Sequence, residues 1–268
     1  MTNVAVAPQI ENQREVAAGA VMNRSRVLRA YRTEAKYESL RMLRLPAFAG
    51  PFLVLPAALY LLFGYVLFGA EIAKDPKTAL FMFMGFSVMG VMGPGMFGFG
   101  TTIATEREQG LLRLKRALPM PPAAALLGKM LMSMLFVAII MVTMAAAAPL
   151  VHLHLPAARL IALSVVCILG SLPFCALGFF IGSLSSGKSA PGFVNLLYLP
   201  MIYLSGILFP MPKSMQWIAY LSPAYHLEQV AFTAIGAPSN GVLIHMAVLA
   251  VVTVVFTTLA VRRLARRG

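Results

Sequence analysis

The sequence predicts an all-α membrane protein with six transmembrane helices, an N-terminal interfacial amphipathic helix and a re-entrant helical segment before the last span. The first observation is composition: 59% of the 268 residues are hydrophobic and 12% are charged, against about 25% charged in soluble domains. The second is that long stretches contain no Asp, Glu, Lys or Arg: 45–70, 78–105, 130–158, 160–187, 189–212 and 229–261. Each exceeds the roughly 20 residues that span a hydrocarbon core. The third is that these runs are continuously apolar, which favours helices over the alternating strands of a β-barrel.

Residues 1–23 are expected to form a disordered cytoplasmic tail, and residues 24–45 a helix. In the predicted helix, apolar and basic side chains recur at helical spacing, with Leu28, Tyr31, Ala35, Met42 and Leu45 among Arg29, Arg32, Lys36, Arg41 and Arg44. Such a helix lies in the membrane interface, with its basic side chains extending toward the lipid phosphates. A solvated basic helix is the alternative. Residues 46–268 are expected to form one membrane domain.

The predicted spans are about 46–68, 79–104, 128–151, 160–184, 190–210 and 240–261, and an even number places both termini on one side. Most of the 22 basic residues fall in the segments on that side, whereas the other side holds only Lys74, Lys77, Arg159 and Lys213. Since basic residues favour the cytoplasmic side, both termini are expected there. Residues 1–44 also lack the apolar core of a signal peptide. The net charge of +13 therefore reports topology, and nucleic acid is excluded as a partner.

Span 2 is rich in glycine, and its Pro94–Gly95 pair predicts a kink. The glycines are Gly85, Gly90, Gly93, Gly95, Gly98 and Gly100. Two interpretations are equally weighted: close packing against another helix, and a helix that moves during function.

Residues 207–239 do not form an ordinary loop. They are mostly apolar but are interrupted by Pro210, Pro212, Pro223 and Pro238. The pieces are too short to span a membrane and too apolar for a free loop, so residues 211–236 are expected to form a re-entrant segment.

The segment 104–122 between spans 2 and 3 predicts a short amphipathic helix, residues 105–118. Glu106 and Glu108 suit the positive end of the helix dipole, and the basic residues Arg113, Lys115 and Arg116 suit its negative end. Leucines provide an apolar stripe, and Pro119 ends the helix. This helix is either plain surface or a docking element for a soluble partner.

Three further patterns carry less weight. Residues Gly182–Ser189 match the phosphate-binding pattern G-x-x-x-x-G-K-[ST], but no β-strand precedes them, so a tight turn is expected instead. His152 and His154 form a weak metal pattern without a nearby carboxylate, and no metal site is predicted. Cys167 and Cys175 are expected to be buried free thiols.

The order and spacing of these features resemble the type-2 ABC exporter permeases over residues 24–265. The resemblance rests on Glu106-Arg107-Glu108-x-Gly110 followed by leucines, basic residues and Pro119, and on Ser222-Pro223-Ala224-Tyr225-His226 before the last span. It is closer to the drug and small-molecule branch than to the polysaccharide branch. It implies a six-span permease in a bacterial cytoplasmic (inner) membrane, with an amphipathic or apolar substrate exported by alternating access.

The resemblance also implies partners and site residues. Two permease copies would pair in the membrane and contact its lipids, and each would dock on a separate ABC ATPase subunit. The ATPase would bind ATP and Mg²⁺, so this chain itself would need no cofactor and would not be an enzyme. The residues expected at the ATPase contact are Glu106, Arg107, Glu108, Gly110, Leu111, Leu114, Arg32 and Lys36.

Candidate residues for an apolar substrate path, chosen for soft or aromatic side chains, are Phe83, Phe86, Met89, Asn195, Tyr198, Ile202 and Tyr203. Charged residues at membrane depth usually have a partner or a function, and His226 with Glu228 is first expected to hold the re-entrant turn by hydrogen bonding. The alternative is a role in substrate release or in an outer gate, for which the candidates are Pro223, Tyr225, His226 and Glu228. The alternatives left open are a polysaccharide or lipid-linked glycan exporter, an intramembrane enzyme, and a passive channel or membrane assembly factor. The enzyme would use His226 with Glu228, or the pair His152 and His154.

Overall fold

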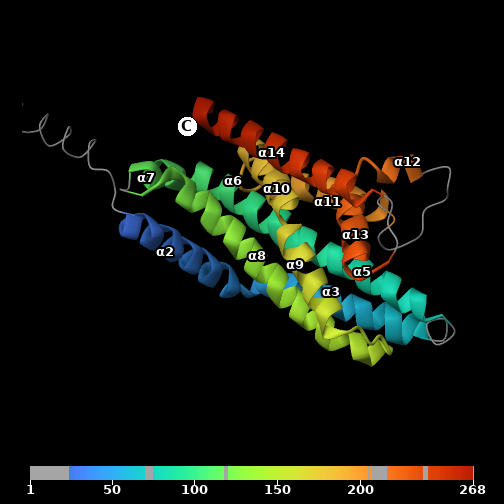
Figure 1. Ribbon diagram of the computed structural model, residues 1–268. Helices are drawn as coiled ribbons and strands as arrows, with labels where there is room; N and C mark the ends of the chain where they lie inside the picture. The colour runs from blue at the N-terminus through green and yellow to red at the C-terminus, as the bar shows by residue number, and fades with distance from the viewer. Residues whose placement is uncertain are drawn as a thin grey trace, which may run out of the picture.

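The computed structural model describes residues 24–69, 75–117, 120–204, 206, 216–237 and 241–267, and these residues are almost entirely helical, without a strand among them (Figure 1). Five helical stretches are long and apolar enough to cross a membrane: Pro46–Leu67, Lys77–Glu108, Ala123–Val151, Ala157–Leu184 and Val242–Arg266. The prediction of an all-α, multi-pass membrane protein is confirmed. The apolar helix Ala190–Tyr203 is shorter than these five, and the predicted tail, residues 1–23, lies outside the described residues.

The N-terminal helix α2 (Arg24–Leu43) packs along α8 (Pro122–Ala147), and Figure 1 shows it beside the N-terminal half of that helix. Its buried residues are Glu38 and Met42, and Met42 joins an apolar cluster with Phe48 and Phe136. After a break at residues 44 and 45, α3 (Pro46–Leu61) continues into a π-helix, η1 (Leu62–Leu67).

The second span is one unbroken rod made of α5 (Pro76–Gly93), a π-helix η2 (Pro94–Phe99) and α6 (Gly100–Glu108). The Asp75 carboxylate caps its start by accepting a hydrogen bond from the Lys77 N–H at 3.0 Å. Pro94 lacks the N–H that an α-helix would use at that position, and the wider π-turn begins there. The local disturbance predicted at Pro94 is therefore a π-helical turn.

The glycines of this rod meet a second set on α10 (Leu172–Leu184). A Cβ at Gly178 would lie 2.6 Å from the carbonyl oxygen of Gly95, and a Cβ at Gly100 would lie 2.9 Å from that of Gly178. Gly182 faces the carbonyl oxygen of Gly100 in the same way. The two backbones can approach this closely only because side chains are absent, which is the first of the two interpretations offered for the glycines.

The remaining helices complete the bundle. Residues 109–110 and then α7 (Leu111–Ala117) connect α6 to α8, and a 3₁₀ turn, η3 (Ala148–Val151), follows α8. Span Ala157–Leu184 consists of α9 (Ala157–Leu169) and α10, with a break at Gly170 and Ser171. The chain then forms α11 (Ala190–Leu204), the short α12 (Gln216–Ala219), α13 (Pro223–Ala234) and the long α14 (Val242–Arg267).

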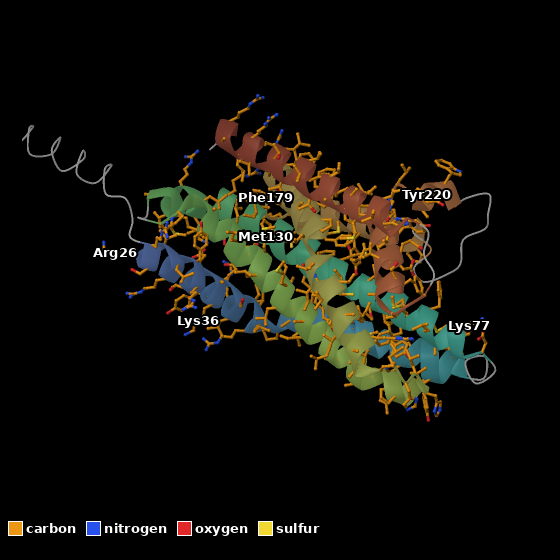
Figure 2. All side chains as sticks on the ribbon, viewed as in Figure 1. Arg26, Lys36, Lys77, Met130, Phe179 and Tyr220 are labelled. Carbon is orange, nitrogen blue, oxygen red and sulfur yellow. The ribbon has the colours of Figure 1, made fainter. Side chains whose placement is uncertain are left out.

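Two ends of the bundle can be distinguished (Figures 1 and 2). One carries α7, the start of α2 and the C-terminal end of α14, and it is called the α7 end below. Figure 2 shows Arg26 and Lys36 on α2 toward this end and Lys77 at the opposite end. Between the ends lies an apolar core whose largest fully buried side chains include Tyr60, Phe83 and Phe174.

Candidate functional site

Glu106, Arg107 and Glu108 occupy the last turn of α6 at the α7 end, and each side chain contacts a different part of the chain. Successive residues of a helix point about 100° apart, so three adjacent charged residues reach three neighbours. Glu106 faces α2 and α8, Arg107 faces the end of α10, and Glu108 faces the turn between α10 and α11.

Glu106 belongs to a buried network that we call the ion cluster: Glu34, Glu38 and Arg41 on α2, Glu106 on α6, Lys115 on α7 and Lys129 on α8. The Lys129 ammonium bonds the carboxylates of both Glu38 and Glu106, the latter at 2.9 Å. Arg41 donates to the same Glu106 oxygen at 2.9 Å. Lys115 binds Glu34 at 2.7 Å and lies 3.7 Å from Glu106.

The ion cluster balances three carboxylates with three cations, and its centre is dry. Lys129 is 0% exposed, Glu106 2% and Glu38 5%. Burial by itself lowers the pKa of Lys115, but the hydrogen bond to Glu34 and the charges of Glu106, Glu34 and Glu38 outweigh it and raise that pKa above its ordinary value. Charge pairs thereby join four helices: α2, α6, α7 and α8.

Arg107 satisfies the C-terminal end of α10. Its guanidinium donates to the carbonyl oxygens of Ser183 and Ser185, the latter at 2.6 Å. Those carbonyls have no partner within the helix, and a cation suits the negative end of the dipole. Arg263 of α14 also donates to the Ser183 oxygen, at 3.3 Å.

Glu108 holds the turn between α10 and α11 by accepting a hydrogen bond from the Gly187 N–H at 2.7 Å. Within this turn, the Ser186 and Ser189 hydroxyls lie 2.9 Å apart and bond each other's backbone. The phosphate-pattern residues thus form a serine-bonded turn that connects two helices, and no strand precedes it in the described part of the chain.

The predicted helix 105–118 is two helices in the structure, because Gly110 adopts a positive φ of +74°. That left-handed conformation ends α6 and suits glycine. After this bend, α7 exposes two leucines, Leu111 (38%) and Leu114 (65%), whereas Leu112 packs against Phe99 and Ile103. An exposed leucine pair on a short helix is a surface that another protein can cover.

The residues predicted at the ATPase contact differ in exposure. Glu108 is exposed, and Arg107 and Gly110 are partly exposed. Leu111, Leu114, Arg32 and Lys36 are exposed. Glu106, in contrast, is buried against cations of its own chain and has no surface to offer a partner in this structure. Its ion pairs with Arg41 and Lys129 instead join α6 to α2 and α8.

The candidate path residues are only partly brought together. Phe83, Phe86, Met89 and Ile202 lie in the apolar core, and the ring of Phe83 packs on Tyr60 at 5.5 Å rather than lining an open passage. The Tyr198 hydroxyl donates to the Met89 carbonyl at 3.3 Å and so connects α11 to α5. Asn195 and Tyr203 are exposed on α11.

The candidate gate residues lie on α13, which packs against α5, α9 and α14. Pro223 begins the helix, and the Tyr225 ring packs on His226 and His245. A carbonyl only accepts, so His226 Nε2–H donates to Tyr220 O at 3.0 Å. In the neutral pair, His226 Nδ1 then accepts from His245 Nδ1–H at 2.7 Å.

Glu228 is the other buried polar group of α13. It is 3% exposed, and its Oε1 has no hydrogen-bond partner among the described residues. Burial raises its pKa to about 8.

The competing enzyme hypothesis also includes the pair His152 and His154. His154 Nδ1 donates to the carbonyl of His152, at 3.3 Å, and His152 lies in a turn with a φ of +56°. No group of three or more potential metal-binding side chains occurs within the described ranges. Cys167 and Cys175 are buried and free, as predicted.

Sequence reasoning missed Lys129, Glu38, Glu34 and Arg41 as parts of the site. A signal was available for Lys129, because a lysine at the edge of a long apolar run needs a buried partner unless it reaches water. Gly178 and Gly182, spaced as small-x-x-x-small, were also overlooked as a helix-contact signal.

Comparison with known proteins adds two similarities. A family model described as ABC-2 type transporter matches residues 29–235. The chain is also 28% identical over 208 residues to a Bacillus subtilis (strain 168) protein named as a transport permease, YvfS. That alignment covers 75% of this chain and 84% of the relative.

Proposed function

This chain belongs to the ABC-2 type transporter family, and we propose that it exports an amphipathic or apolar substrate from the cytoplasm, driven by a separate ATPase subunit. The family and the named relative make the chain a membrane permease subunit of an ABC transporter. The direction of transport, the substrate and the ATPase partner belong to the proposal. We propose that the ATPase partner binds ATP and Mg²⁺, because the phosphate-pattern residues of this chain form a turn between α10 and α11.

The observation that carries the proposal is the exposed apolar surface of α7 held by the ion cluster. Leu111 and Leu114 face outward, and Lys115 on the same short helix is bonded to Glu34 of α2. We place the ATPase against α7 and against the exposed Arg32 and Lys36 of α2. A displacement of α7 by the ATPase would then move α2, α6 and α8 together, because buried ion pairs are costly to separate.

The topology assigned to this function has six spans with both termini in the cytoplasm of the bacterial inner membrane. The span added to the five long stretches is α11, the fifth in chain order, whose apolar sequence continues past the described helix. The segment that contains α12 and α13 is re-entrant. Its support is that α13 has only 12 residues and packs inside the bundle with Ala224 and Leu227 fully buried.

Two permease copies are proposed to pair through α11. This helix exposes Asn195, Leu199 and Tyr203 in one row, at a spacing of four residues. Substrate would move between the copies past Asn195, Tyr198 and Tyr203, rather than through the packed core around Phe83. Pro223, Tyr225, His226 and Glu228 would form the outer gate, because the His226–His245 hydrogen bond connects α13 to the last span.

The test starts from co-purification. The tagged chain, expressed in its native membrane, is expected to carry an ABC ATPase with it. Leu114→Asp places a charge in the proposed contact and is expected to weaken the complex about thirtyfold, the effect of losing a central apolar anchor of about 2 kcal/mol.

Leu150→Asp is the matched control, because Leu150 is 59% exposed in η3, remote from α7. Its complex is expected to stay intact. Equal ATPase recovery with both variants and the unaltered chain would remove α7 as the docking element. ATP-dependent uptake of a fluorescent amphipath into inside-out vesicles, lost with Leu114→Asp, would then establish export.

A further inference from the structure

A basic cavity lies at the C-terminal end of α14, at the α7 end of the bundle. Its volume is about 420 Å³, and its lining is Phe180, Leu259, Arg262, Arg263 and Arg266. Figure 2 shows nitrogen-tipped side chains projecting from this end of α14. Three guanidinium groups gathered around one cavity are suited to an anion with several oxygen atoms.

These arginines have no carboxylate partner among the described residues, in contrast to the cations of the ion cluster. Arg262 and Arg266 are four residues apart on one helix face, a spacing at which like charges repel. Arg263 is fixed by its bond to the Ser183 carbonyl. The arrangement leaves a positive charge that nothing in the described chain neutralises.

An apolar groove of about 530 Å³ adjoins this cavity, and Phe180 lines both. The groove lies between α10, α11 and α14, and its walls include Leu184, Phe193, Leu197, Val252 and Phe256. The rings of Phe180 and Phe256 pack edge to face at 5.3 Å where the two spaces meet. Basic and apolar surfaces are thus continuous along α14.

The length of this combined surface matches one leaflet of a bilayer. From Val252 to Arg262 the helix rises about 15 Å, at about 1.5 Å per residue. Half of a hydrocarbon core of about 30 Å is also about 15 Å. An acyl chain in the groove would therefore place its headgroup at the arginines.

We propose that the cavity and groove bind one anionic phospholipid from the leaflet at the α7 end, with its phosphate at Arg262, Arg263 and Arg266. One acyl chain lies along Phe180 and Phe256. The inference goes beyond the transport function, because it requires only that the chain sit in a membrane, and it is tested without ATP or a partner subunit.

Tryptophan quenching tests this site directly. The chain has one tryptophan, Trp217, so Trp217→Phe combined with Phe193→Trp leaves a single reporter on the groove rim, where Phe193 is 54% exposed. The protein is reconstituted in phosphatidylcholine vesicles that contain either brominated phosphatidylglycerol or brominated phosphatidylcholine. The brominated anionic lipid is expected to quench at a far lower mole fraction.

Arg262→Gln with Arg266→Gln is expected to reduce that preference about thirtyfold, because each basic residue near an anionic lipid contributes about 1 kcal/mol to binding. Arg26→Gln with Arg29→Gln removes the same charge from exposed positions of α2 and is expected to leave the preference unchanged. Inorganic phosphate at millimolar concentration is expected not to reverse quenching, because the acyl chain holds the lipid.

Three results would overturn the proposal. The first is equal quenching by both lipids. The second is a preference that both arginine pairs reduce alike, which would mean a general charge effect. The third is absence of quenching by either lipid, which would mean that a second copy of the chain covers the groove. Leu196→Trp, at a neighbouring rim position that is 72% exposed, repeats the measurement if Phe193→Trp disturbs folding.

Discussion

The ammonium group of Lys129 lies between the carboxylates of Glu38 and Glu106, with none of its side chain exposed. Taking these charges out of water costs several kcal/mol per ion, and their mutual attraction offsets that cost only while the set is complete. Arg41 adds a second cation on Glu106 at 2.9 Å. The ion cluster therefore contributes more to fixing the relative positions of α2, α6 and α8 than to net stability.

This argument predicts the effect of removing one charge. Lys129→Met leaves two buried carboxylates facing each other, and the free energy of unfolding is expected to fall by about 3–5 kcal/mol. The double variant Lys129→Met with Glu106→Gln restores the charge balance and is expected to recover most of the loss. Both are measured by denaturant unfolding of the purified protein in detergent micelles.

Lys188→Met is the matched control, because Lys188 is exposed in the turn before α11. A surface change of this kind is expected to alter stability by less than about 0.5 kcal/mol. A double variant as unstable as Lys129→Met alone would contradict the view that charge balance, rather than the lysine itself, stabilises the site.

At the scale of helices, the contact between the second span and α10 depends on absent side chains. Gly95 and Gly100 on one helix face Gly178 and Gly182 on the other, and each pair brings a carbonyl oxygen to where a Cβ would be. Lipid provides no hydrophobic force between helices, so close van der Waals packing is what associates them. Arg107 and Glu108 continue the same pairing at the α7 end.

Gly178→Ala is therefore expected to destabilise the bundle by about 1–3 kcal/mol, as overpacking does, although alanine is the better helix former. The inserted Cβ would lie 2.6 Å from the Gly95 oxygen and 2.7 Å from the Met96 oxygen. Gly192→Ala on α11 is expected to stabilise the bundle instead, by up to about 1 kcal/mol, because alanine is the better helix former. No neighbouring helix or side chain lies within 4 Å of the added Cβ. Thermal unfolding in nanodiscs compares the two, and a loss with Gly192→Ala as large as with Gly178→Ala would refute the packing argument.

The sequence was informative about elements and less so about their junctions. Apolar runs predicted the five long spans to within a few residues, because length and composition suffice for that. The division of residues 105–118 into two helices was not predicted, since Gly110 was taken for part of a motif rather than for a left-handed residue. The exposure of Leu114 follows from that bend and could not be seen without it.

At the scale of the whole molecule, basic residues have two roles: they orient the chain in the membrane, and they form ion pairs inside the bundle. The sequence alone does not distinguish these two roles. Lys129 and Lys188 both lie in segments that the sequence predicts to be cytoplasmic, yet Lys129 is fully buried and Lys188 is exposed. The difference arises because Glu38 and Glu106, distant in sequence from Lys129, meet it in the bundle. Pairings between distant residues depend on helix packing, so a single sequence could not reveal the ion cluster.

The exposed charges still specify an orientation, which can be measured. The native thiols, Cys167 and Cys175, are buried and are expected to stay unlabelled by a membrane-impermeant maleimide. Single cysteines can therefore be placed at Lys188, in the turn that Glu108 holds at the α7 end, and at Arg159, at the start of α9. Both positions are exposed.

Because basic residues favour the cytoplasmic side, the α7 end is expected to face the cytoplasm. In intact cells Arg159→Cys is expected to be labelled, and Lys188→Cys only after the membrane is permeabilised. The reverse pattern would place α7 outside, where no ATPase could reach it, and would remove the docking proposal together with the orientation. The two labelled positions lie at opposite ends of one helical stretch, Ala157–Leu184. Labelling of both positions in intact cells would therefore show that this stretch does not span the membrane.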